Sequence, residues 1–199
     1  MKKYIVFDFD GTLADSEKVA FHVINKLADR HGFPKMDLKQ MVKLKSQGET
    51  FQTFSRIATE YYRLYKEYLY DIKLFDGILE MLYELRDNGN TIVVISSNEE
   101  SNIREYFQKN RVDLIKKIYT SSDLLGKAKR IEDLCERHNL CKSEVIYVGD
   151  EIRDIQASLK SRVEVIWVSW GFDTAEIALK ENPTYVANTP ADIVRLVKG

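Results

Sequence analysis

The sequence has few cysteines, no excess of either charge and no long apolar run near its start. Its 199 residues include two cysteines, Cys135 and Cys141, without CxxC spacing, so we expect free thiols in a reducing, cytoplasmic compartment. Lysine and arginine number 30 and aspartate and glutamate 31, and this balance argues against general binding to nucleic acid or anionic membranes. From the short apolar stretches we expect no signal peptide and no membrane span.

Short runs of β-branched and aromatic residues alternate with longer amphipathic segments. Most runs are continuously apolar, which is typical of strands covered on both faces. The expected strands are Tyr4–Phe7, Ile92–Ile95, Ile118–Tyr119, Val145–Val148, Val163–Val168 and Tyr185–Val186. The expected helices are Ile78–Asp87, Ser101–Gln108, Lys127–His138, Glu151–Leu159, Ala175–Lys180 and Ala191–Val197. This alternation predicts an α/β fold with a doubly wound, parallel, Rossmann-like sheet.

One long segment interrupts the alternation. Between about Ser16 and Lys73 the sequence has helical periodicity and no convincing strand, and it is too long for a single crossover. We therefore expect an all-helical subdomain at residues 16–73, inserted into an α/β core domain made of residues 1–15 and 74–199. Two sets of side chains in the insert stand out. For Tyr61, Tyr65 and Tyr68, on one helical face, packing is favoured over ligand stacking. For Lys39, Lys43 and Lys45, near a break in the helical pattern, a solvated face is favoured over contact with an anionic substrate.

Polar residues follow four of the expected strands at the point where each strand ends. In an open parallel sheet, ligands bind beyond the carboxyl ends of the strands. The polar residues are Asp8, Asp10, Gly11 and Thr12 after the first strand, Ser96, Ser97 and Asn98 after the second, Lys127 beyond the loop that follows the third, and Gly149, Asp150, Glu151 and Asp154 after the fourth. Carboxylates, hydroxyls and a lysine should therefore converge at one edge of the sheet.

These residue types indicate a particular chemistry. Carboxylate oxygens with a nearby backbone carbonyl suit Mg²⁺, and a lysine with hydroxyl and backbone donors suits the oxygens of a phosphoryl group. A carboxylate can attack phosphorus, and a second one nearby can protonate the leaving oxygen and later deprotonate water. The pair Asp8 and Asp10 is therefore predicted to supply one nucleophile and one general acid/base.

Four stretches resemble, in order, the motifs of the haloacid dehalogenase-like (HAD) hydrolase superfamily. They are DFDGTLADS (8–16), ISSN (95–98), the lysine of GKAKRIEDL (126–134) and VGDEIRD (148–154). The C-terminal stretch VEVIWVSWGFDTAEIAL is similar to the tail of the phosphoglycolate-phosphatase-like branch. The resemblance implies a small helical cap placed after the first motif.

The resemblance also implies a role for individual residues. Asp8 would be the nucleophile and Asp10 the acid/base, and Lys127 would neutralise the phosphate and Asp8 together. Mg²⁺ would be held by the Asp8 carboxylate, the Asp10 carbonyl and Asp150, with Asp154 acting through water or a hydrogen bond. The phosphate-binding set would be Gly11, Thr12, Ser96, Ser97, Asn98 and Lys127, with Ser96 favoured over Ser97 as the hydroxyl that binds a phosphoryl oxygen.

The expected function is Mg²⁺-dependent hydrolysis of a small phosphorylated metabolite, with phosphoglycolate or a similar phosphomonoester favoured. The alternatives are a phosphomutase, a dehalogenase, and a binding or regulatory relative without turnover. Intact Asp8, Asp10, Lys127 and Asp150 argue against the last of these. The oligomeric state, monomer or dimer, is left open.

Overall fold

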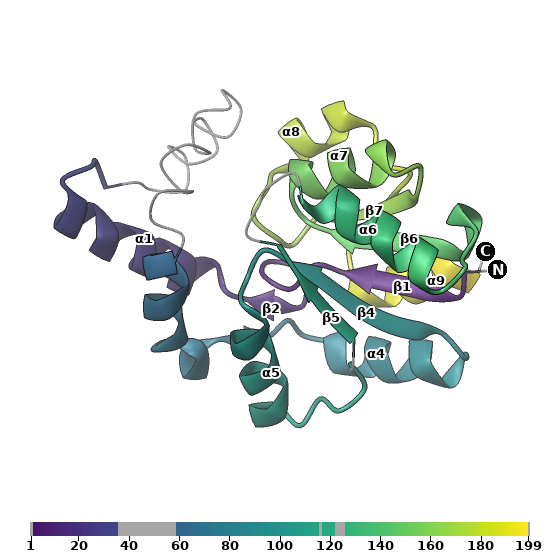
Figure 1. Cartoon of the computed structure of the whole chain (residues 1–199), viewed down its shortest axis with the longest axis horizontal. Helices are drawn as coiled ribbons and strands as arrows, with labels where there is room; N and C mark the ends of the chain where they lie inside the picture. The colour runs from purple at the N-terminus through teal and green to yellow at the C-terminus, as the bar shows by residue number, and fades with distance from the viewer. Residues whose placement is uncertain (1, 36–58, 116, 122–125, 199) are drawn as a thin grey trace.

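The computed structural model describes residues 2–35, 59–115, 117–121 and 126–198. Its main sheet is parallel and has the order β5-β4-β1-β6-β7-β8. The strands are β1 (Tyr4–Phe7), β4 (Thr91–Ser96), β5 (Lys117–Thr120), β6 (Val145–Gly149), β7 (Glu164–Val168) and β8 (Tyr185–Ala187). The order runs outward in both directions from β1, so the expected α/β fold with a doubly wound parallel sheet is confirmed (Figure 1). The switch between the two directions lies at β1, where such sheets bind ligands.

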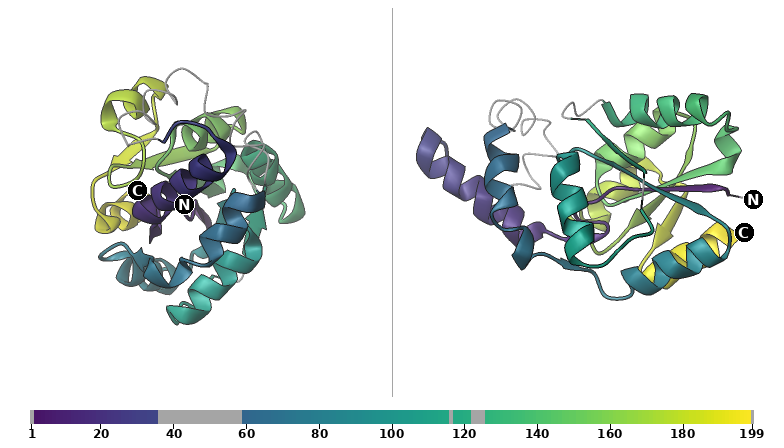
Figure 2. Two further views of the ribbon diagram at one scale, coloured as in Figure 1. Left: turned by 90° about the vertical axis from the view of Figure 1, so that its left-hand side faces the viewer. Right: turned by 60° about the horizontal axis from the view of Figure 1, so that its bottom comes forward.

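Helices cover both faces of this sheet. One face carries α4 (Ile78–Asp87), α5 (Glu100–Lys109) and α9 (Pro190–Lys198), and the other carries α6 (Gly126–Arg137), α7 (Ile152–Lys160) and α8 (Ala175–Ala178). Figure 2 shows α9 beside α4. Along β1, Ile5 and Phe7 join one hydrophobic cluster and Val6 joins the other. This alternation explains the continuously apolar sequence, because both faces of each strand are buried.

Most helix ends differ from the expected ones by one residue, and α7 shows the physical reason. Glu151 was expected inside this helix, but its backbone is extended and it caps the helix instead. The Asp154 carboxylate accepts a hydrogen bond from the Glu151 amide at 3.1 Å, in a capping box. The expected helix at 175–180 is a short α-helix that continues as a 3₁₀ turn, Leu179–Glu181.

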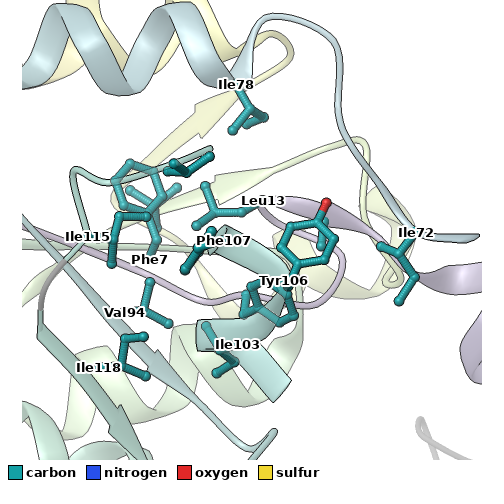
Figure 3. Packing of buried hydrophobic residues seen from close by; sticks show 14 of the residues in the cluster. Phe7, Leu13, Ile72, Ile78, Val94, Ile103, Tyr106, Phe107, Ile115 and Ile118 are labelled. Carbon is teal, nitrogen blue, oxygen red and sulfur yellow. The ribbon is translucent and has the colours of Figure 1, made fainter. Parts of the chain in front are cut away.

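The larger hydrophobic cluster joins the core to the inserted segment, by which we mean residues 16–73. It contains Phe7 and Phe107 from the core and also Val23, Leu27 and Tyr65 from the inserted segment, all of them buried. Figure 3 shows Phe7 and Phe107 near Leu13 and Tyr106. The two parts of the chain are therefore packed against each other rather than merely linked.

The described residues of the inserted segment include two helical stretches, α1 (Glu17–His31) and residues 59–66, and a 3₁₀ turn at Leu69–Asp71. An antiparallel ribbon of β2 (Ala14–Asp15) and β3 (Lys73–Leu74) brackets the segment. This ribbon was not expected, because two-residue strands carry no readable periodicity. Lys39, Lys43 and Lys45 lie outside the described residues. Within the described ranges, no helix has the length and apolar character needed to cross a membrane.

Candidate active site

Asp8 lies at the centre of the site, directly after β1. Its amide donates a hydrogen bond to the Val148 carbonyl at 2.9 Å, which extends the pairing of β1 with β6 by one residue. Its side chain is buried, and the Oδ1 atom accepts a hydrogen bond from the Phe9 amide at 2.7 Å. The strand ends thus hold the carboxylate at the switch point of the sheet.

Lys127, in the first turn of α6, is fully buried between two carboxylates. Its Nζ atom lies 2.6 Å from Asp8 Oδ2 and 2.5 Å from Asp154 Oδ1. The Tyr147 hydroxyl lies 3.2 Å from the same Asp154 oxygen. Sequence reasoning placed Asp8, Lys127 and Asp154 at one sheet edge, and the structure brings them into direct contact.

The burial of these groups changes their protonation. Burial raises the pKa of the Asp8 carboxyl to about 7, against the opposing effect of the Lys127 ammonium. Burial alone would lower the pKa of Lys127, but the carboxylates of Asp154 and Asp8 outweigh it and raise that pKa above its ordinary value. The lysine therefore supplies a permanent positive charge beside Asp8.

Asp10, two residues further on, lies in a different environment from Asp8. Its Oδ1 atom accepts a hydrogen bond from the Tyr65 hydroxyl at 2.5 Å, and its Oδ2 atom accepts one from Asn98 Nδ2 at 2.9 Å. Desolvation raises the pKa of this carboxyl, although the nearby side chains of Tyr65, Ser16 and Asn98 act in the opposite direction. A carboxyl with a raised pKa is suited to proton transfer near neutral pH.

The Asp150 carboxylate is bound by a hydroxyl and a backbone amide. Its Oδ1 atom accepts a hydrogen bond from Thr12 Oγ1 at 2.6 Å, and its Oδ2 atom accepts one from the Phe172 amide at 2.8 Å. Gly11, with φ of +77°, and Gly171 lie so close to this carboxylate that a methyl group at either would overlap it. Burial, followed by the charge of Glu151, raises the pKa of Asp150 well above its ordinary value.

One group of carboxylates has the spacing of a metal site. Oxygens of Asp8, Glu151 and Asp154 lie within 4.8 Å of one another, and all three residues are buried. Such a set of oxygen ligands fits a hard divalent cation such as Mg²⁺. Glu151 was not singled out from the sequence as a ligand, and the available signal was its position next to Asp150 at the end of β6.

The remaining candidates lie around the end of β4. Ser96 is buried and its Oγ atom accepts a hydrogen bond from the Asn98 amide at 3.1 Å. Ser97 is half-buried and its Oγ atom accepts one from Arg153 Nη1 at 3.2 Å. Arg153 also forms an ion pair with Glu151. Sequence reasoning missed Arg153, and the preference for Ser96 over Ser97 stays a prediction.

The parallel sheet thus has a central strand that ends in a buried carboxylate, paired with a lysine from α6. The sequence matches the haloacid dehalogenase-like hydrolase family over residues 5–168. The chain belongs to this family, and the expected resemblance is confirmed.

Individual relatives agree with this assignment. A phosphoglycolate phosphatase from Synechococcus elongatus is 27% identical to this chain, and the match covers 97% of this chain and 96% of the relative. A 5'-nucleotidase from Pseudomonas aeruginosa is 26% identical, with 91% of this chain and 89% of its own covered. The expected class of enzyme, a phosphoric monoester hydrolase of this family, is confirmed.

Solved structures agree on the fold. The haloacid dehalogenase-like family hydrolase from Streptococcus pneumoniae superimposes with a TM-score of 0.79 at 24% identity, and the match covers 98% of both chains. A structure from Clostridium acetobutylicum, described as a predicted phosphatase, gives a TM-score of 0.84 at 23% identity, with 100% of this chain and 99% of the other covered.

Proposed function

We propose that this protein is a Mg²⁺-dependent phosphatase that hydrolyses a small phosphorylated metabolite through an aspartyl-phosphate on Asp8. The observation that carries the proposal is the buried contact of Asp8 with Lys127 at 2.6 Å, at the switch point of the sheet. A carboxylate kept beside a permanent cation is a nucleophile whose partner also neutralises an incoming phosphate.

In the first step, an Asp8 carboxylate oxygen forms a bond to phosphorus while the bond from phosphorus to the ester oxygen breaks. The protonated Asp10 carboxyl gives its proton to the leaving alkoxide, which departs as the alcohol. Lys127 stabilises charge on the transferred phosphoryl group, and the preferred Ser96 hydroxyl binds one of its oxygens.

In the second step, the Asp10 carboxylate takes a proton from a water molecule. The water oxygen bonds to phosphorus as the bond to the Asp8 oxygen breaks. Inorganic phosphate leaves, Asp8 returns to a carboxylate and Asp10 is protonated again, so that every proton is accounted for.

The acidic cluster supports the expected cofactor. Asp8, Glu151 and Asp154 would hold Mg²⁺, together with the Asp10 carbonyl and Asp150 that the family resemblance implies. When bound, the cation supplies positive charge that draws the phosphate oxygens toward Asp8 and offsets their repulsion from its carboxylate.

The favoured substrate is phosphoglycolate or a similarly small phosphomonoester. The relative from Synechococcus elongatus that carries this activity in its name spans nearly the whole of both chains, and this supports the choice. Other relatives are named as a 5'-nucleotidase and, at 23% identity, as a pyrophosphatase from Listeria innocua. Substrate choice therefore varies on this fold.

A panel of phosphorylated metabolites tests the proposal. We expect phosphate release from phosphoglycolate and p-nitrophenyl phosphate with Mg²⁺, loss of turnover in excess chelator, and recovery when Mg²⁺ is restored. Asp8→Asn should abolish turnover and leave the melting temperature largely unchanged, and acid quench should place the phosphoryl group on Asp8. Full activity in chelator contradicts the metal assignment. Preferential transfer to an added sugar phosphate indicates a phosphomutase instead.

A further inference from the structure

The Asp10 carboxyl is held by two donors that come from different parts of the chain. The Tyr65 hydroxyl, from helical residues 59–66 of the inserted segment, lies 2.5 Å from Oδ1. The Asn98 amide, from the loop after β4, lies 2.9 Å from Oδ2. Each carboxylate oxygen therefore has its own donor, and together the two fix the rotation of the side chain.

The Asn98 amide is itself held in place. Its Oδ1 atom accepts hydrogen bonds from the Glu99 amide at 2.8 Å and from Asn102 Nδ2 at 3.1 Å. Asn102, on α5, also donates from Nδ2 to the Tyr62 carbonyl at 3.2 Å. The helix at residues 59–66 thus reaches Asp10 by two routes, directly through Tyr65 and indirectly from Tyr62 through Asn102 and Asn98.

Other contacts seat the inserted segment on α5. Lys66 pairs with Glu105 at 3.1 Å, and Lys109 Nζ donates a hydrogen bond to the Tyr70 carbonyl at 2.6 Å. Tyr65 itself is fully buried, so its ring is fixed by packing. The position of its hydroxyl consequently depends on how the inserted segment sits against the core.

We propose that Tyr65 is a positioning residue for Asp10: together with the Asn98 amide, its hydroxyl holds the Asp10 carboxyl in the orientation that serves proton transfer. Proton transfer then depends on the seating of the inserted segment against α5. The inference rests on the proposed function, because it assigns Asp10 as the acid/base. It also gives Asn98 a task other than the phosphate binding expected from the sequence.

The substitution Tyr65→Phe removes the hydroxyl and keeps the ring. Tyr106→Phe is a matched control, because Tyr106 is also buried and its hydroxyl has no hydrogen-bond partner among the described residues. Its ring packs edge-on against Phe9, with 5.0 Å between centroids. Tyr65 and Tyr106 belong to the same hydrophobic cluster, and Figure 3 shows Tyr106 near Leu13 and Phe107. Each variant removes one buried hydroxyl oxygen, but only the Tyr65 hydroxyl forms a hydrogen bond with Asp10.

We expect Tyr65→Phe to lower kcat about tenfold or more on an alkyl phosphomonoester, since the hydrogen bond that orients the Asp10 carboxyl is lost. KM should change little, and formation of the aspartyl-phosphate from p-nitrophenyl phosphate, whose leaving group needs no acid, should be less affected. Tyr106→Phe should match the wild type. In an Asp10→Ala background, adding Tyr65→Phe should cause no further loss, because the group that it positions is gone.

If Tyr65→Phe lowers kcat by the same factor in the Asp10→Ala background as in the wild type, the proposal is overturned, because Tyr65 would then act on the substrate or the fold. Equal behaviour of Tyr65→Phe and Tyr106→Phe overturns it as well. An arm without turnover keeps the test independent of the proposed function: in a crystal structure of Tyr65→Phe, Asp10 should leave its present orientation, and an unmoved Asp10 contradicts the proposal. If instead Asp8→Asn retains wild-type turnover, the proposed function fails.

Discussion

The two aspartates at the end of β1 are held in opposite ways. Asp8 is bound by the core alone, with Lys127 and the Phe9 amide as its donors, and its surroundings are charged. Asp10 is bound by the neutral donors Tyr65 and Asn98, one of which belongs to the inserted segment. The proposed nucleophile, Asp8, is therefore held by the core alone, whereas the proposed acid/base, Asp10, is held by donors from both parts of the chain.

The largest expected effect comes from removing the Asp10 carboxyl, which tests whether Asp10 acts as an acid/base rather than as a nucleophile. Asp10→Ala should lower kcat roughly 10²- to 10⁴-fold on substrates with poor leaving groups, the usual range for losing general acid/base catalysis. With p-nitrophenyl phosphate, the first step should slow less than the second, in which Asp10 activates water, so the aspartyl-phosphate should accumulate. Rapid-quench kinetics measure this. Equal losses on good and poor leaving groups, without a trapped intermediate, would remove Asp10 from this role.

The next effect concerns the charged environment of Asp8. Lys127→Met should lower kcat about 10²- to 10³-fold, as expected when a donor to the developing charge is lost. It should also destabilise the metal-free protein by about 3–5 kcal/mol, because two buried carboxylates lose their common partner. Denaturant unfolding and kinetics measure both. Lys129→Met, at an exposed position on the same helix, is the control and should change neither value.

A smaller effect follows from the raised pKa of Asp8. The carboxyl has a pKa of about 7 in the folded protein, against an ordinary value of 3.8. The folded state therefore binds the proton more tightly, and this stabilisation is complete below the ordinary value and is lost as the pH rises toward 7. In chelator, the melting temperature of the wild type should fall more steeply between about pH 4 and pH 7 than that of Asp8→Asn. Parallel curves would contradict the shift.

The smallest effect contrasts two buried tyrosines. The hydroxyl of Tyr147 lies 3.2 Å from Asp154 and 3.0 Å from the Ile95 carbonyl, all within the core. Tyr147→Phe should cost about 1 kcal/mol of unfolding free energy and change kcat by only a few-fold. Tyr65→Phe should do the reverse, with a larger loss of kcat than of stability. If both variants lose kcat and unfolding free energy in the same proportion, the contrast between the core tyrosine and the tyrosine of the inserted segment is contradicted.

The same contrast explains which parts of the molecule could be predicted from sequence. Asp8, Lys127 and Asp154 were identifiable because parallel strands end at one edge, so the pattern of strands alone brings these residues together. Tyr65 was visible only as part of a helical face. Its partner lies 55 residues away, and that contact depends on the packing of the inserted segment, which periodicity does not encode. The helix cap at Glu151 was missed for a similar reason, since an acidic residue is equally compatible with the first turn of a helix.

The β2–β3 ribbon bears on how this chain tolerates change in length. Ala14 pairs with Leu74 and Asp15 with Lys73, so the chain leaves the core and returns to it at neighbouring points. The entropy of closing so large a loop grows only slowly with its length, and the ribbon already joins the two ends. A graft of different length can therefore replace surface residues between these ends without shifting the register of β1 against β4, provided that it keeps Tyr65 and the buried side chains that pack on the core.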